Sequence, residues 1–191
     1  MPAVLAELPV PGAEQMRALG RRLASLLRPG DLVVLTGPLG AGKTTLAQGI
    51  GQGLGVRGPV TSPTFVIARV HPSAGGGPAL VHADAYRLGS RAEVDDLDLD
   101  ADLERSVTVV EWGEGLVEDL ADSHLEIRIT LPPAVGGGAA EEGGGGVAEE
   151  GGGGVAEDNT VRAVRLTGRG QRWEAAAESA RLALAGGPQD L

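Results

Sequence analysis

A glycine-rich turn between an apolar run and a helical pattern constrains this chain most. The run LVVLT at residues 32–36 leads into GPLGAGKT at residues 37–44, and TLAQGIGQGLG follows. The turn satisfies G-x-x-x-x-G-K-[ST] in full, between a strand and a helix, which is the setting in which this pattern holds phosphate groups. Glycines let backbone N–H groups face the phosphates, and the helix N-terminus adds partial positive charge. We therefore predict a nucleotide site in an α/β fold.

The residues of this turn can be assigned to parts of a bound nucleotide. We expect Lys43 to reach the β and γ phosphates, Thr44 to bind Mg²⁺, and Thr45 to touch the α phosphate. The other nucleotide-binding residues that we expect in the turn are Gly37, Pro38, Leu39, Gly40, Ala41 and Gly42.

Lysine usage narrows the choice of nucleotide. Lys43 is the only lysine of the chain, and every other basic residue is arginine. A guanine-reading N-K-x-D loop would need a second lysine, so this device for binding GTP is excluded. We therefore expect the cofactors to be ATP and Mg²⁺.

Two acidic residues follow apolar strand patterns. Asp84 ends the run LVHAD and Glu111 ends SVTVVE, and β-branched runs of this kind are typical of central parallel strands. Ligands bind at the carboxyl ends of such strands, so both carboxylates are candidate magnesium ligands and candidates for orienting an attacking water. Either one could instead cap a helix. With Lys43, they are the predicted catalytic residues.

The chain as a whole reads as one α/β domain over residues 1–191. We predict a P-loop NTPase fold, in which a mostly parallel central sheet is flanked by helices and antiparallel strands follow toward the C-terminus. The patterns predict strands at 32–36, 64–70, 79–84, 106–112, 124–131 and 160–168, and helices at 13–28, 44–55 and 173–185. The octapeptide AEEGGGGV occurs at 140–147 and again at 148–155, which predicts a flexible Gly/Glu-rich insertion at about 134–159.

Composition excludes several other classes of protein. Cysteine is absent, and the histidines at 71, 82 and 124 are too scattered for a local metal-ligand pattern. No apolar run approaches the roughly 20 residues of a membrane helix, and the N-terminus lacks the basic start of a signal peptide. We expect a soluble cytoplasmic protein with no membrane partner.

Net charge argues against direct nucleic-acid binding. The formal charge is −10, but six of the 26 acidic residues lie between 141 and 158, and without them it would be only −4. No basic face of the kind that neutralises nucleic-acid phosphates is visible, so DNA or RNA is not an expected direct partner.

Aromatic residues are scarce and lie close to the predicted site. The chain has four, and three of them, Phe65, Tyr86 and Trp112, lie within two residues of Thr64, Asp84 or Glu111. We interpret them as packing residues of ordered segments rather than as ligand contacts.

Four motifs in sequence order carry a resemblance to a known family. GPLGAGKTTL, VTSPTF, HADAYRL and VVEWGE closely resemble the motifs of the TsaE family, over roughly residues 10–132. TsaE proteins are bacterial ATPases required for making threonylcarbamoyladenosine at position 37 of tRNAs that read codons beginning with A. Two departures are Pro38, where an acidic residue is common in the family, and the Gly/Glu-rich segment.

The resemblance implies roles for further residues. Ser62 and Thr64 of SPTF would sense the γ phosphate, and Asp84 would be the Walker B-like aspartate. Glu111 would be a magnesium ligand, with Trp112 beside it near the nucleotide. The implied partners are the TsaB and TsaD proteins, with tRNA contacted only indirectly through that complex, since TsaD performs the carbamoyl transfer.

Residues and resemblance together favour an ATP-driven conformational switch. No arginine is evident as a finger, and P-loop hydrolysis without one is slow, so we expect weak ATPase activity that the partners stimulate. Two alternatives stay open. One is a small-molecule P-loop kinase, and the other is an adaptor that binds nucleotide without hydrolysing it.

Overall fold

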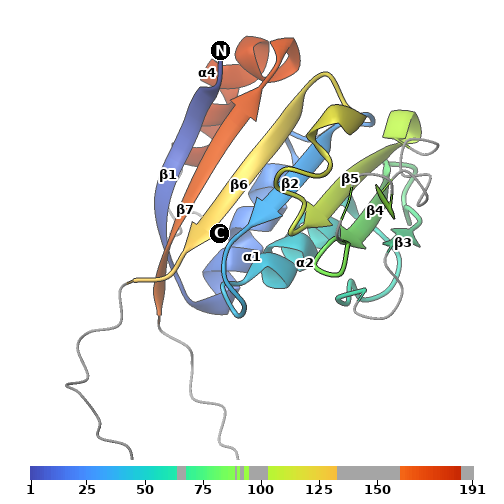
Figure 1. Ribbon diagram of the computed structural model, residues 1–191, viewed down its shortest axis with the longest axis horizontal. Coiled ribbons are helices and arrows are strands. Elements are labelled where there is room, and N and C mark those ends of the chain that lie inside the picture. Colours follow the sequence, from blue (N-terminus) through green and yellow to red (C-terminus); the bar gives the residue numbers. More distant parts are fainter. Residues whose placement is uncertain (64–67, 89, 91–92, 95–102, 133–159, 186–191) are drawn as a thin grey trace, which may run out of the picture.

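A seven-stranded sheet organises the described part of the molecule (Figure 1). The computed structural model describes the chain except residues 64–67, 89, 91–92, 95–102, 133–159 and 186–191. The described strands are β1 (Ala3–Pro11), β2 (Leu32–Thr36), β3 (Ala68–His71), β4 (Ala79–Asp84), β5 (Ser106–Glu111), β6 (His124–Thr130) and β7 (Val161–Arg169). Their order in the sheet is β1-β7-β6-β2-β5-β4-β3. The predicted insertion at about 134–159 lies outside the described residues.

The centre of the sheet is parallel and its flanks are antiparallel. β2 lies between β5 and β6 and pairs in parallel with both, and β4 pairs in parallel with β5. β7 pairs antiparallel with β6 and β1, and β3 pairs antiparallel with β4. The predicted architecture, a parallel centre with antiparallel strands toward the C-terminus, is therefore confirmed.

Strand β1 was not among the predicted strands. Its sequence AVLAELPVP contains Pro9 and Pro11, and proline cannot donate a hydrogen bond to a sheet ladder. The structure places β1 at the edge of the sheet, paired only with β7. Only one side of an edge strand needs donors, so the prolines are accommodated there.

Helices cover one face of the sheet, and loops cover part of the other. α1 (Gly12–Ala24), α2 (Lys43–Leu54) and α4 (Gln171–Ala185) lie behind the strands in Figure 1. Alternate residues of β2 separate the two cores, because Val33 and Leu35 pack with the helices while Leu32 and Val34 pack with the loop side. Two short 3₁₀ turns, η1 (Leu103–Arg105) and η2 (Glu118–Leu120), lie in connecting segments.

The first helix ends four residues earlier than predicted. The predicted helix continued through Ser25, Leu26 and Leu27. The backbone N–H groups of these three residues donate to carbonyl oxygens three residues back rather than four. This tightening is common at helix ends and is followed by Pro29-Gly30, which stops the helix.

Helices α1 and α2 approach each other through glycines. A Cβ atom added at Gly49 would lie 2.3 Å from the carbonyl oxygen of Arg17, and one at Gly20 would lie 2.5 Å from that of Leu46. Only glycine permits such a distance between helix backbones. Because α2 begins at Lys43, this contact also sets the position of the glycine-rich turn.

Replacing Gly49 by Ala is therefore expected to lower the free energy of unfolding by about 1–3 kcal/mol, because the helices must move apart. Urea denaturation monitored by circular dichroism measures the change. Gly77→Ala is the matched control, since its Cβ would lie 3.4 Å from the nearest atom, and we expect a change within about 0.5 kcal/mol. Equal midpoints for the two variants would contradict this account of the helix contact.

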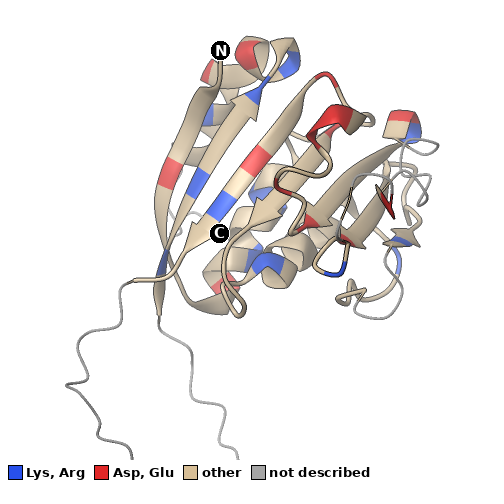
Figure 2. Ribbon diagram, in the orientation of Figure 1, with Lys and Arg blue, Asp and Glu red and all other residues tan. Residues whose placement is uncertain are grey.

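Charges of both signs are interspersed on the described surface. In the view of Figure 2, β6 carries both acidic and basic residues, β7 carries basic residues, and acidic residues gather on the loop after β5. No helix among the described residues has the length and apolar character that crossing a bilayer demands.

Candidate nucleotide site

A cavity of about 370 Å³ opens at the carboxyl ends of β2, β4 and β5. Its lining residues come from the glycine-rich turn, the first turn of α2, the segment before β3 and the ends of β4 and β5. They are Leu39, Gly40, Gly42, Lys43, Thr44, Thr45, Ser62, Pro63, Asp84, Tyr86, Arg87, Glu111 and Trp112. Residues that are far apart in the sequence thus meet at one edge of the sheet.

The glycine-rich turn requires glycine at its first position. Gly37 has φ 149°, and a Cβ atom there would lie 2.4 Å from the carbonyl oxygen of Ile129 in β6. Gly42, directly before α2, has φ 106° in the left-handed region. The loop therefore turns tightly against the sheet, and the N-terminus of α2 faces the cavity through Thr44 and Thr45.

Lys43 is buried and held by the loop itself. Its Nζ donates hydrogen bonds to the carbonyl oxygens of Gly37 at 2.8 Å and Pro38 at 2.9 Å. The same atom lies 3.7 Å from the centre of the Trp112 ring, a cation–π contact. Burial lowers the pKa of the Lys43 ammonium below its ordinary value, and the carboxylates of Glu111 and Asp84 oppose that shift.

The hydroxyl of Thr44 contacts the predicted carboxylate directly. Its Oγ1 lies 2.8 Å and 3.0 Å from the two carboxylate oxygens of Glu111, whose side chain is almost completely buried. Asp84 is the register partner of Glu111 in the β4–β5 ladder, and its Oδ1 accepts the backbone N–H of Tyr86 at 3.0 Å. The structure therefore brings both predicted carboxylates to the same place beside Thr44.

This donor set fits Mg²⁺. The ion prefers oxygen ligands and is usually held by one or two carboxylates, with waters and substrate phosphates completing its shell. Thr44, Glu111 and Asp84 offer one hydroxyl and two carboxylates at the edge of the cavity. Among the residues that the structure describes, no three His, Cys, Asp or Glu side chains form a separate metal-binding group.

Trp112 has an unusual backbone for a bulky residue. Its φ is 61°, in the left-handed region, and its N–H donates to the carbonyl oxygen of Leu35 at 2.9 Å. Such backbone conformations cost about 1–3 kcal/mol and gather at functional sites. The Trp112 ring contacts both the Lys43 ammonium and the ring of Tyr86, whose centre is 5.2 Å away.

The aromatic residues do not all have the packing role predicted for them. That prediction is wrong for Tyr86, which is 68% exposed and lies at the cavity. Trp112 also lines the cavity, beside Lys43. Phe65 lies outside the described residues, as does Thr64 of the predicted γ-phosphate sensor.

The other predicted nucleotide residues occupy three kinds of position. Ser62 and Leu39 line the cavity, and Leu39 is strongly exposed. Gly37 and Pro38 act on Lys43 through their carbonyl oxygens rather than by lining the cavity. Ala41 is fully buried under the loop, and its N–H donates to Pro38 at 3.1 Å.

Sequence reasoning missed four residues at or beside the cavity. Pro63, Tyr86 and Arg87 line it, and His82 lies behind it against Glu111. A signal for His82 was present, because it precedes Asp84 by two residues and alternate strand residues share a face. Tyr86 and Arg87 lie in the turn after β4. The spacing of residues in the sequence does not predict the path of that turn.

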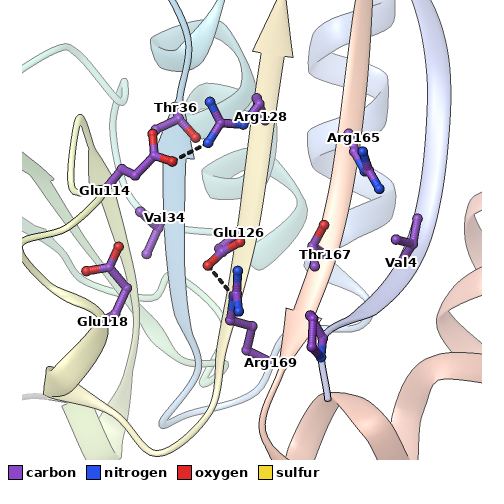
Figure 3. A pocket seen from close by; sticks show the side chains of 11 residues that line it. Val4, Val34, Thr36, Glu114, Glu118, Glu126, Arg128, Arg165, Thr167 and Arg169 are labelled. Carbon is purple, nitrogen blue, oxygen red and sulfur yellow. Dashed lines mark hydrogen bonds and ion pairs between the residues drawn. The ribbon is translucent and has the colours of Figure 1, made fainter.

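A second cavity, of about 330 Å³, lies on the face of the sheet away from the helices (Figure 3). Arg128 of β6 forms an ion pair with Glu114, and Arg169 of β7 forms one with Glu126. Glu114 belongs to the loop after β5 and follows Trp112 by two residues. The loop after β5 therefore reaches from the first cavity to the second.

Comparison with known proteins identifies the family. The family model described as "Threonylcarbamoyl adenosine biosynthesis protein TsaE" matches residues 10–134. The chain belongs to the TsaE family. The resemblance carried by the four sequence motifs is thus confirmed, and the family is one of proteins of tRNA threonylcarbamoyladenosine biosynthesis.

Several TsaE proteins are similar over much of the chain. The "tRNA threonylcarbamoyladenosine biosynthesis protein TsaE" of Streptomyces coelicolor is 59% identical over 162 residues, which cover 84% of this chain and 95% of the relative. The protein of the same name from Bacillus subtilis is 38% identical over 117 residues, covering 61% and 72%.

A solved structure supports the TsaE fold. The crystal structure of YdiB from the same Bacillus species aligns with a TM-score of 0.65 and 26% sequence identity. The alignment covers 94% of this chain and 95% of that one. The predicted P-loop fold class is therefore confirmed.

Proposed function

We propose that this TsaE-family chain is a slow, Mg²⁺-dependent ATPase whose nucleotide state controls its association with TsaB and TsaD in the cytoplasm. One observation carries the proposal. Lys43, predicted to bind phosphate, contacts Trp112, the residue directly after β5. Thr44, predicted to bind the metal, contacts Glu111 at the end of β5.

These contacts must change when a nucleotide binds. The Lys43 ammonium has three hydrogens, and two of them point at the carbonyl oxygens of Gly37 and Pro38 while Trp112 covers the ion. Phosphate oxygens would compete for those hydrogens. Thr44 would likewise share its oxygen with a metal rather than donate only to Glu111. Nucleotide binding therefore acts directly on Glu111 and Trp112.

The loop after β5 offers a route from the nucleotide to the outer surface. Glu114 lies two residues after Trp112 and forms an ion pair with Arg128 on the outer sheet face (Figure 3). A ligand shifts a conformational equilibrium only through contacts that differ between the states, and Lys43 and Thr44 supply such contacts at one end of this loop. The exposed ion pair at the other end is a place where a partner would sense the change.

The side chains of the cavity suit phosphoryl transfer to water. Lys43 would neutralise charge on the β and γ phosphates, and Thr44, Glu111 and Asp84 would hold Mg²⁺. The bound ion supplies charge neutralisation at the phosphate oxygens. Asp84 or Glu111 would accept a hydrogen bond from the attacking water, and Ser62, which lines the same cavity, would contact the terminal phosphate.

ATP turnover with and without the partners tests this proposal. We expect the chain alone to turn over on the order of 10⁻⁴ to 10⁻² per second, as P-loop switches do when no partner supplies an arginine finger, and the TsaB and TsaD complex to raise that rate. Turnover of tens per second that the complex leaves unchanged would contradict it. ATP bound and recovered intact even with the complex would favour the adaptor alternative.

Contact with tRNA is proposed to run through the partners. Basic and acidic groups are mixed on the face shown in Figure 2, and the formal charge of the chain is −10. We therefore expect only weak tRNA binding by the isolated chain in filter-binding assays. Tight binding that falls steeply with salt would contradict this part of the proposal.

The family assignment gives no support to the small-molecule kinase alternative.

A further inference from the structure

A fully buried histidine lies behind the Glu111 carboxylate. His82 of β4 is 0% exposed, and its Nε2 lies 2.9 Å from Oε1 of Glu111. In the parallel β4–β5 ladder His82 is level with Val109, two residues before Glu111. The ring therefore reaches along the shared face of the two strands to the end of β5.

The direction of this hydrogen bond follows from the chemistry of the partners. A carboxylate oxygen only accepts, so Nε2 of His82 carries the hydrogen and donates it to Glu111. The other ring nitrogen, Nδ1, has no hydrogen-bond partner in the described part of the chain. Within that part, the hydrogen bond to Glu111 is the polar contact that offsets the cost of burying the His82 ring.

His82 and Thr44 hold the carboxylate from two sides. Oε1 of Glu111 accepts from His82 at 2.9 Å and lies 2.8 Å from Thr44 Oγ1, while Oε2 lies 3.0 Å from the same Thr44 oxygen. The terminal torsion of a glutamate is broad, so hydrogen bonds decide the orientation of its carboxylate plane. A bound metal would disturb the contact between Thr44 and Glu111. The hydrogen bond from His82 would then still hold the Glu111 carboxylate in its orientation.

We propose that His82 is a positioning residue for Glu111. It fixes the carboxylate so that one face stays turned toward Thr44, where the two residues can share Mg²⁺ when nucleotide binds. This inference rests on the proposed Mg²⁺-nucleotide site and adds a residue behind it. Partners of this kind typically account for 10- to 100-fold in metal affinity.

The competing explanation is that His82 only fills the core. A second buried histidine serves as a control that distinguishes core packing from positioning of Glu111. His71 of β3 is 4% exposed, and its Nε2 has no hydrogen-bond partner among the described residues. Substituting His71 disturbs a buried imidazole in the same part of the sheet without removing a hydrogen bond to Glu111.

The test compares His82→Gln with His82→Asn, and both with His71→Asn. The amide nitrogen of Gln can take the place of Nε2, whereas that of Asn is too short to reach Glu111. Calorimetry would measure the affinity of each protein for a non-hydrolysable ATP analogue, once with Mg²⁺ and once with EDTA. Thermal unfolding of each ligand-free variant would report on its stability.

We expect His82→Asn to bind the analogue at least tenfold more weakly than the wild type with Mg²⁺, and within about twofold of it with EDTA. His82→Gln should recover most of the loss, and His71→Asn should match the wild type under both conditions. Wild-type affinity of His82→Asn with Mg²⁺ would overturn the inference, and so would an equal loss with EDTA. A wild-type chain that binds no analogue at all would refute the nucleotide site itself, and the inference with it.

Discussion

Replacing Lys43 by Ala is expected to weaken ATP binding by about 10²- to 10⁴-fold and to remove measurable turnover. The ammonium is buried at the base of the cavity, where it would donate to phosphate oxygens. Each charge-assisted hydrogen bond is worth about 1.5–3 kcal/mol, and the substitution removes two of them. No other lysine exists in the chain to replace it. Calorimetric titration with ATP and Mg²⁺ measures the loss.

The control for Lys43→Ala removes a different positive charge. Arg165 lies on the floor of the outer cavity, away from the nucleotide (Figure 3), so Arg165→Ala should keep the wild-type affinity. Lys43→Arg should not rescue binding, because a planar guanidinium does not replace a compact ammonium in a tight loop. Wild-type turnover in Lys43→Ala would refute the site assignment.

Replacing Glu111 by Gln is expected to lower Mg²⁺-dependent turnover by roughly 100-fold, which corresponds to about 3 kcal/mol of lost metal-assisted charge stabilisation. The amide keeps the shape of the side chain but lacks its negative charge. It also carries hydrogens where the carboxylate now accepts from both Thr44 and His82. Initial rates measured across a range of Mg²⁺ concentrations give the change.

Comparison with other acidic residues makes the Glu111 result specific. Glu126 lies on the outer sheet face, paired with Arg169, and Glu126→Gln should turn over ATP within about twofold of the wild type. Asp84→Asn separates the roles of the two carboxylates. If it retains Mg²⁺-dependent binding but loses turnover, Asp84 orients the water. Unchanged turnover in Glu111→Gln would contradict its assignment as a metal ligand.

Much of the fold follows from local signals in the sequence. The strands at 32–36 and 79–84 were predicted at their observed bounds, because glycine, proline and aspartate bracket short β-branched runs. The parallel order then brings the ends of β4 and β5 together beside the glycine-rich turn. Strand β1 could not be predicted in this way, since its prolines are tolerated only at an edge that the sequence does not reveal.

The finer geometry of the site depends on contacts that spacing does not encode. The positive φ of Trp112 has no signal in the sequence, because it arises where the chain leaves β5 and bonds to Leu35. The exposed position of Tyr86 depends on the turn after Asp84. His82 shares a strand face with Asp84, but its hydrogen bond to a carboxylate 29 residues away does not follow from that spacing.

The central claim is that nucleotide state controls association with the partners. Its most direct test is co-purification of the full chain with TsaB and TsaD in saturating ATP and in saturating ADP, with Lys43→Ala in parallel. The account predicts strong recovery of the complex in one nucleotide and little in the other, with no such difference for Lys43→Ala. Equal recovery of the wild-type chain in ATP, in ADP and without nucleotide would contradict it.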